Sequence, residues 1–178
     1  LRIADTATGE TVETGIVGEI RMRSPFMTKG YFDNPAATAE AFDDAGYLRT
    51  GDLGVLDDEG YLRVTGRLKE MIIRGGENIY PREIEDRLSD FPDVAECAVV
   101  GLPHPKFGEE VAIAVRCRAG TTIDVERART FLLERIARHK MPKRWKLVEE
   151  FPRTASGKIQ KFELIALFSG EDDQTGPA

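Results

Sequence analysis

The alternation of hydrophobic and polar positions divides the chain into a first part rich in strands and a second part that mixes strands and helices. In the first part, apolar and polar residues alternate over residues 16–23. Two more apolar-periodic runs, residues 47–56 and 61–65, flank the polar stretch Asp-Asp-Glu-Gly at 57–60. A period of two predicts strands, and a polar stretch ending in glycine between two such runs predicts a hairpin turn.

One short helix is expected within this first part, which covers residues 1–66. Asn34 followed by Pro35 is typical of a helix start, because the asparagine side chain can cap the helix and proline suits its first turn. The helix should cover residues 36–42. So little chain does not predict a core that is stable by itself.

The second part, residues 70–168, has helical spacing of apolar residues in two segments, one starting at Pro81 and one capped by Asp124. The predicted inner faces are Ile84, Leu88 and Phe91 in the first helix, and Ala128, Phe131, Leu132 and Ile136 in the second. Further predicted elements are strands at 71–73, 94–102, 111–117 and 145–148, a loop containing Pro103, Pro105 and Gly108, and a last helix at 161–168. The expected fold class is α+β.

Charge changes this picture only slightly. Residues 1–66 carry 6 basic and 12 acidic groups, a net charge of −6, whereas residues 67–170 carry 19 basic and 16 acidic groups, a net charge of +3. The weakly basic second part is compatible with binding a phosphorylated ligand, but its net positive charge is too small to predict nucleic-acid binding. No apolar run approaches the roughly 20 residues of a transmembrane helix, so no membrane span is expected.

The two cysteines, Cys97 and Cys117, lie in apolar runs and have no metal-like spacing. We expect reduced core thiols, no metal site and a cytoplasmic protein. The chain starts with Leu1 inside an apparent strand, which predicts a piece of a longer protein, and residues 169–178 are expected to be a disordered tail.

Three stretches carry the candidate chemistry, in a fixed order. They are Tyr47-Leu48-Arg49-Thr50-Gly51-Asp52-Leu53-Gly54, then Gly66-Arg67-Leu68-Lys69-Glu70 running to Gly75-Gly76-Glu77-Asn78, and finally Pro152-Arg153-Thr154-Ala155-Ser156-Gly157-Lys158-Ile159. The last stretch is not a nucleotide-binding P-loop, because Pro152 stands where the first glycine is needed and Ile159 where serine or threonine is needed.

Together these stretches resemble the C-terminal signatures of the adenylate-forming superfamily, which includes acyl-CoA synthetases, peptide-synthetase adenylation domains and luciferases. The resemblance covers essentially the whole chain. It implies that residues 1–66 are the β-rich end of a large N-terminal domain, that residues 67–69 form a hinge, and that residues 70–168 form a small mobile C-terminal domain. The hinge residue would be Lys69, which by itself would be an ordinary solvent-facing lysine on a strand.

The resemblance also assigns roles to residues that have ordinary explanations. Asp52 would bind the ribose of the nucleotide, since a carboxylate can accept two hydrogen bonds from a diol, and Gly51 would permit close approach. Arg67, across the predicted hairpin, would contact the same nucleotide. Otherwise Asp52 is a loop aspartate after glycine, and Arg67 belongs to a weak surface ion pair.

Four residues of the second part complete the expected site. Lys158 matches the catalytic lysine of the family, although an isolated loop lysine would be unremarkable. Gly75 and Gly76 would line the tunnel for the pantetheine of CoA, or else form a plain turn. Asn78 matches a position that approaches phosphate in relatives.

The resemblance implies that the parent protein is an AMP-forming acyl-CoA synthetase that uses ATP with Mg and then CoA. Its partners would be these small molecules and a carboxylic acid, with no nucleic acid and no specific protein partner evident. The phosphate-binding loop of the family is absent from the 178 residues, so the isolated chain is expected to be inactive. Three alternatives stay open: a peptide-synthetase adenylation domain, a luciferase-like oxidation, and a degenerate homologue that serves as an interaction module.

Overall fold

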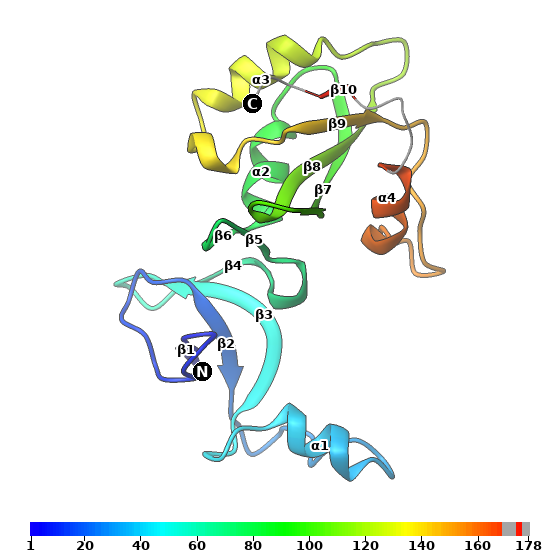
Figure 1. Ribbon diagram of the computed structural model, residues 1–178. Coiled ribbons are helices and arrows are strands. Elements are labelled where there is room, and N and C mark those ends of the chain that lie inside the picture. The colour runs from blue at the N-terminus through cyan, green and yellow to red at the C-terminus, as the bar shows by residue number, and fades with distance from the viewer. Residues whose placement is uncertain (169–173, 176–178) are drawn as a thin grey trace. The chain divides into compact units, whose positions relative to one another are not determined.

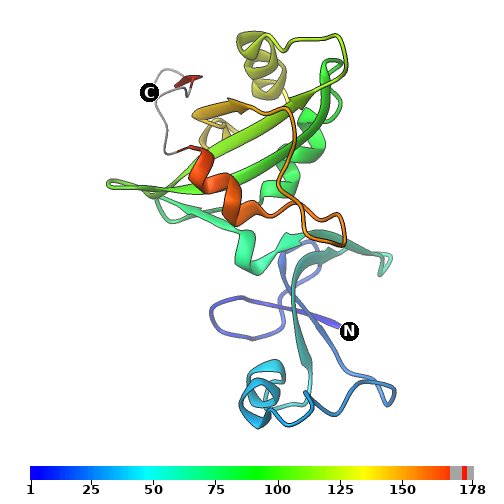
Figure 2. The same ribbon diagram turned by 90° about the vertical axis from the view of Figure 1, so that its right-hand side faces the viewer.

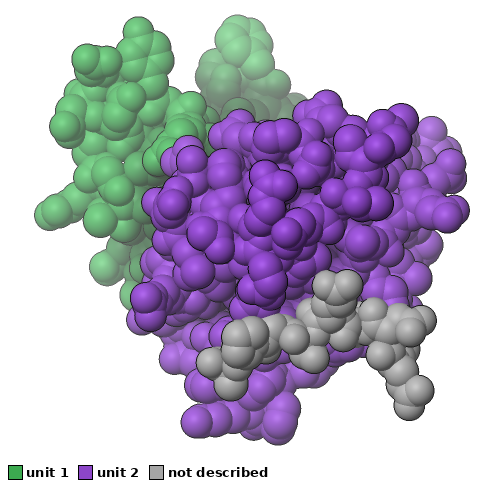
Figure 3. Space-filling view, turned by 90° about the horizontal axis from the view of Figure 1, so that it is seen from above, with its two compact units in different colours: residues 1–69 green, residues 70–178 purple. Residues whose placement is uncertain are grey.

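Two compact units, residues 1–69 and residues 70–178, make up the protein in the computed structural model, which describes residues 1–168 and 174–175 (Figure 3). The arrangement of domain, hinge and second domain stays a prediction, because compactness does not test whether residues 67–69 move. The predicted tail lies outside the described residues, except for positions 174 and 175.

The first unit contains a four-stranded antiparallel sheet with the order β1-β2-β3-β4 (Figure 1). The turn between the last two strands forms as expected, since the Asp57 carboxylate accepts hydrogen bonds from the backbone amides of Glu59 and Tyr61 at 3.1 and 2.8 Å. Such a bond replaces the backbone partners that a turn lacks. The strands are β1 (Arg2–Ala4), β2 (Gly18–Met22), β3 (Leu48–Leu56) and β4 (Leu62–Arg67).

The predicted short helix of this unit is α1 (Pro35–Ala41). Its first turn is capped by Asn34, whose Oδ1 accepts a hydrogen bond from the amide of Ala37 at 3.0 Å. The sequence therefore located this helix correctly, because both of its start signals act within one turn.

A mixed sheet forms the centre of the second unit. Its longest part is the β7–β8 hairpin, and β9 runs parallel to β8. The predicted loop with Pro103, Pro105 and Gly108 is shorter than expected, because β7 continues to His104 and β8 begins at Gly108. Proline is tolerated in β7 because, among the described residues, this strand pairs only with β8. The strands are β5 (Ile72–Arg74), β6 (Glu77–Ile79), β7 (Val94–His104), β8 (Gly108–Cys117), β9 (Arg144–Leu147) and β10 (Gln174–Thr175).

Helices cover both faces of this sheet, as Figures 1 and 2 show for α2 and α4 on opposite sides of β7 and β8. Two predicted core residues, Phe91 and Ile136, are buried but lie beyond the helices that were expected to carry them. The helices are α2 (Pro81–Leu88), α3 (Val125–Leu133) and α4 (Lys161–Leu167), with 3-10 turns η1 (Leu68–Glu70) and η2 (Arg138–Lys140).

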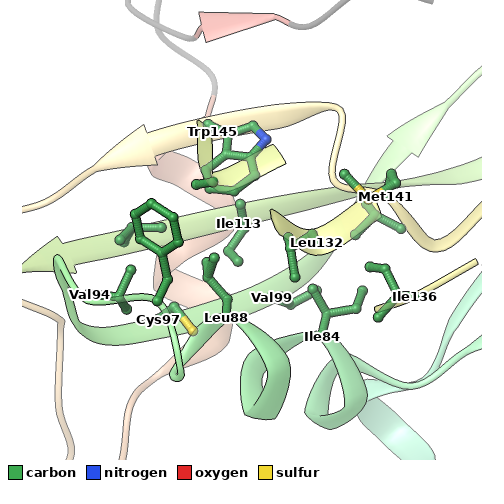
Figure 4. Close-up of a cluster of buried hydrophobic side chains, with 14 of the residues drawn as sticks. Ile84, Leu88, Val94, Cys97, Val99, Ile113, Leu132, Ile136, Met141 and Trp145 are labelled. Atoms are coloured by element: carbon green, nitrogen blue, oxygen red, sulfur yellow. The ribbon is translucent and has the colours of Figure 1, made fainter. Parts of the chain in front are cut away.

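Successive residues of the central hairpin supply two separate cores. On one face, Val99 and Ile113 pack with Leu88 of α2, Leu132 of α3 and Trp145 of β9 (Figure 4). On the other face, a second cluster joins the strands to α4: Ala98, Val100, Leu102, Ala112, Ala114, Phe151, Leu164 and Phe168. Alternate side chains of a strand point to opposite faces, so a continuous apolar run is what a strand buried on both sides requires.

The predicted α+β class is confirmed by these two units, one sheet-rich and one with helices on both faces of a mixed sheet. None of the helices in the described part of the chain is long and apolar enough to cross a membrane.

Candidate functional site

Asp52 and Arg67 lie opposite each other on β3 and β4, and their side chains form an ion pair with 3.3 Å between Nε and Oδ1. The side chains are 41% and 58% exposed, respectively. An exposed pair adds little stability. It places the guanidinium group beside one carboxylate oxygen, Oδ1, and the exposed carboxylate can also accept hydrogen bonds from hydroxyl donors.

A β-bulge creates this pairing. Leu56 pairs with Leu62 and Gly54 with Val64, but further along Leu53 pairs with Gly66, so Thr65 is an extra residue on β4. If the register of Leu56 and Gly54 continued unchanged, Gly66 rather than Arg67 would stand opposite Asp52. A bulge changes the direction of the side chains that follow it, and here it brings Arg67 opposite Asp52.

The segment before Asp52 is fixed by its own hydrogen bonds. Thr50 donates its hydroxyl hydrogen bond to the carbonyl of Ile20 at 2.7 Å and accepts one from the amide of Asp52 at 3.1 Å. Gly51 has a φ of 71°, a region that favours glycine, and a Cβ there would meet no atom within 4 Å. The backbone conformation is therefore sufficient to explain this glycine without a ligand.

Gly75 and Gly76 form the two-residue turn of a β5–β6 hairpin, with φ values of 61° and 89°. Two successive residues with positive φ are typical of a type I′ turn, which favours glycine at both positions. The sequence indicated one short strand here and missed the second, on which Asn78 is exposed and pairs with Ile73. The plain-turn alternative therefore accounts for both glycines, and their role in a CoA tunnel stays a prediction.

Lys158 is exposed and ends a loop that is closed by its own backbone. The Thr154 amide donates to the carbonyl of Lys158 at 2.8 Å, and the Lys158 amide donates to the Thr154 hydroxyl at 3.1 Å. Gly157, with a φ of 83°, makes the tight turn possible. The ammonium group has no partner among the described residues, so a cation is available on a backbone of defined shape.

Lys69 is exposed and lies in the 3-10 turn η1, so the expectation of a strand at this residue is wrong. It is the last residue of the first unit, and Glu70 is the first residue of the second. Lys161 of α4 joins Glu70 and Glu85, with its Nζ at 2.8 and 2.7 Å from their carboxylate oxygens. The residue after the predicted hinge is thereby tied to two helices of its own unit.

A separate network of charges lies in the first unit, beside a hollow of about 490 Å³. Asp43 contacts Arg2 and Arg21 at 2.6 and 3.1 Å, and Arg21 also contacts Glu19 at 2.9 Å. Burial alone would raise the pKa of the Asp43 carboxyl, but a hydrogen bond from the Tyr47 backbone and the two guanidinium groups lower this pKa to about 2. The network therefore supports the fold of this unit.

The described residues contain neither a disulfide bond nor a metal-binding cluster. Both cysteines are free, and burial raises the pKa of the Cys97 thiol to about 12, which leaves it unreactive at neutral pH. No three histidine, cysteine, aspartate or glutamate side chains gather into a metal site within the described ranges. The described side chains therefore offer no cluster of this kind for Mg.

Comparisons with known proteins agree with this arrangement. Residues 83–158 match the family described as the AMP-binding enzyme C-terminal domain. The indoleacetate–CoA ligase of Aromatoleum aromaticum is 48% identical over 159 residues, which are 89% of this chain and 31% of that protein. The ATP-bound crystal structure of MatB from Rhodopseudomonas palustris is 40% identical with a TM-score of 0.87, over 94% of this chain and 33% of that one.

The chain is similar to the C-terminal third of adenylate-forming enzymes. A third solved structure, the amide bond synthetase McbA from Marinactinospora thermotolerans, is 38% identical with a TM-score of 0.88, over 94% of this chain and 33% of that one. The chain spans about a third of the length of the relatives that it matches.

The structure brings some of the predicted site residues together and adds others. Asp52 and Arg67 pair directly, and Lys158 stands on a closed loop of the second unit. Sequence analysis missed Glu96, which binds this loop through Arg153. One signal was available, since Glu96 is the single charged residue in the apolar run 94–102.

Proposed function

We propose that this chain is the C-terminal portion of an AMP-forming acyl-CoA synthetase, an acid–thiol ligase with ATP and CoA as co-substrates. The observation that carries the proposal is the Lys158 ammonium group, which is exposed and unpaired among the described residues on a loop closed by its own hydrogen bonds. The similarity to CoA ligases supports the choice of acceptor.

In the first step, an oxygen of the substrate carboxylate bonds to the α-phosphorus of ATP, and the bond to pyrophosphate breaks. Lys158 would stabilise the negative charge that is redistributed among the carboxylate and phosphate oxygens. Asp52 would accept hydrogen bonds from the two ribose hydroxyls with its free lone pairs. Arg67 lies beside that carboxylate and would itself donate to the nucleotide, because a guanidinium group has several donors.

In the second step, the sulfur of CoA bonds to the acyl carbon, the bond to AMP breaks, and the thiol proton is lost. The Gly75-Gly76 turn would lie along the path of the pantetheine, with Asn78 near a phosphate. Lys158 serves only the first step, so one domain must change its position between the steps. We assign that pivot to residues 67–69, with Lys69 as the residue that changes its backbone angles.

A second candidate differs only in the acceptor. The similarity to an amide bond synthetase, at a TM-score of 0.88, supports an amine as the alternative acceptor, because that relative has the same fold in this part of its chain. An adenylation domain that passes the acyl group to a carrier protein would share the first step as well.

The test uses the full-length parent protein, ATP, Mg and a panel of fatty, alicyclic and aromatic acids. Release of pyrophosphate with at least one acid, followed by CoA-dependent formation of a thioester and AMP, is the expected result. Pyrophosphate release without thioester formation, but with amide formation from an added amine, would select the second candidate. The absence of nucleotide binding and of pyrophosphate release would identify a degenerate homologue. A cytoplasmic location is part of the proposal and is tested by fractionating cells.

A further inference from the structure

Glu96 lies at an unusual position for a charge. It is on β7, a strand whose other residues up to Leu102 are uncharged, and its side chain is 25% exposed. Arg116 stands opposite it on β8 and contacts its carboxylate at 3.3 Å. The carboxylate is thus held on the sheet by a cross-strand pair.

The same carboxylate receives a second arginine, from the loop that carries Lys158. Arg153 donates from Nη2 to both oxygens of Glu96, at 2.7 and 2.5 Å. It also donates from Nη1 to the carbonyl of Gly157 at 2.9 Å. One guanidinium group therefore joins the strand to the residue immediately before Lys158, and these planar donors are held in a fixed geometry.

Other hydrogen bonds of this loop act inside it. Residues 154–158 bond among themselves, and Arg153 pairs with Ile159 in an isolated β-bridge. These bonds define the shape of the loop but do not attach it to the sheet. At the two ends of the loop, the side chains of Phe151 and Ile159 pack against the second core. Between these ends, Arg153 makes a polar side-chain contact with the sheet, through Glu96.

We propose that Glu96 is a positioning residue for adenylation, acting through Arg153 to hold the Lys158 loop against the strand. This inference rests on the proposed role of Lys158. Glu96 touches no substrate in this role. Its effect is to limit the positions of the ammonium group, and a displacement of about 1 Å of a catalytic group can cost on the order of 10²-fold in rate.

The experiment uses the full-length parent with the substitution Glu96→Gln, which keeps the size of the side chain and removes its charge. We expect the maximal rate of pyrophosphate release without CoA to fall by roughly 10-fold to 100-fold. Conversion of supplied acyl-adenylate to thioester should stay within about 2-fold, because Lys158 does not serve that step. Hydrogen exchange at the amides of Gly157 and Lys158 should become faster.

Two further variants separate positioning from general stability. Arg153→Lys keeps the charge but loses the two-oxygen contact, so its rate should lie between those of Glu96→Gln and the unaltered enzyme. Glu134→Gln is the matched control, because Glu134 makes an exposed ion pair with Arg135 immediately after α3, and it should change neither the rate nor the exchange.

Several results would overturn the proposal. One is an unchanged rate of pyrophosphate release in both Glu96→Gln and Arg153→Lys, while Lys158→Ala is slow; the proposed function would then stand without this anchor. Another is an equal loss of both steps together with a lowered melting temperature, which would show a purely structural pair. If Lys158→Ala is fully active, the proposed function fails, and unchanged exchange at Gly157 in Glu96→Gln would separately refute the anchor.

Discussion

Replacing Lys158 by alanine in the full-length parent should slow acyl-adenylate formation strongly and leave the fold intact. The side chain is exposed, and its ammonium group contacts no other described residue. Removing it breaks none of the contacts that hold the loop, which come from the backbone, from Thr154 and from Arg153. Substitutions at such surface positions usually change the free energy of unfolding by no more than about 0.5 kcal/mol.

The loss of rate is expected to be much larger than this loss of stability. Removing one preorganised charge contact to a transition state typically costs about 10²–10³ in rate, or about 2.7–4 kcal/mol of barrier height. Pyrophosphate release measured in a single turnover, with acid and ATP but without CoA, reports this step. Thioester formation from supplied acyl-adenylate reports the second step and should be nearly unchanged.

Lys29→Ala provides the control, because Lys29 is also exposed and its ammonium group forms no ion pair within the described part of the first unit. It should leave both steps unaltered. Unchanged pyrophosphate release in Lys158→Ala, or a block of the thiol step alone, would refute the assignment of this loop.

Further predictions concern the hinge, the isolated chain and acid stability. Lys69→Pro in the parent should impair thioester formation much more than pyrophosphate release, because proline fixes φ at the predicted pivot; equal losses in the two assays would indicate misfolding instead. The 178-residue chain alone should produce no acyl-CoA in an assay free of the parent enzyme, and measurable product would contradict this. Because the folded-state pKa of Asp43 is lowered to about 2 from 3.8, its contribution, about 2 kcal/mol, should be present above pH 4 and lost as the pH falls to 2. Denaturant unfolding between pH 5 and 2 should show this loss, and Asp43→Asn should remove that part of the pH dependence.

Local signals predicted much of the fold. Asn34 and Asp124 cap helices with bonds to amides two or three residues away, so a few letters of sequence contain the whole interaction. Gly75 and Gly76 were ambiguous for a physical reason: glycine serves a tight hairpin turn, a bulge and a close approach of a ligand equally well. Which of these roles the glycines have depends on whether a partner strand follows them. Residues 77–79 do form such a strand, but three residues are too few to show an alternation of apolar and polar positions.

The candidate site was predictable only where one hairpin connects its members. Asp52 and Arg67 flank a turn, so sequence placed them across from each other, although the bulge at Thr65 that aligns them was not foreseen. Glu96 and Arg153 are 57 positions apart and meet because the loop after β9 returns to β7. No local periodicity contains such a contact, since it depends on the packing of the whole unit.

The apolar character of β8 on both faces has a consequence for how the strand stays in register. Where one face is polar, a slip by one residue exposes apolar groups and is opposed by water. Here Val111, Ile113 and Val115 face the larger core, while Ala112 and Ala114 face α4. A slip would exchange two apolar sets, leaving gaps on one side and overfilling the other. The volume of the side chains, rather than their polarity, keeps this strand in place.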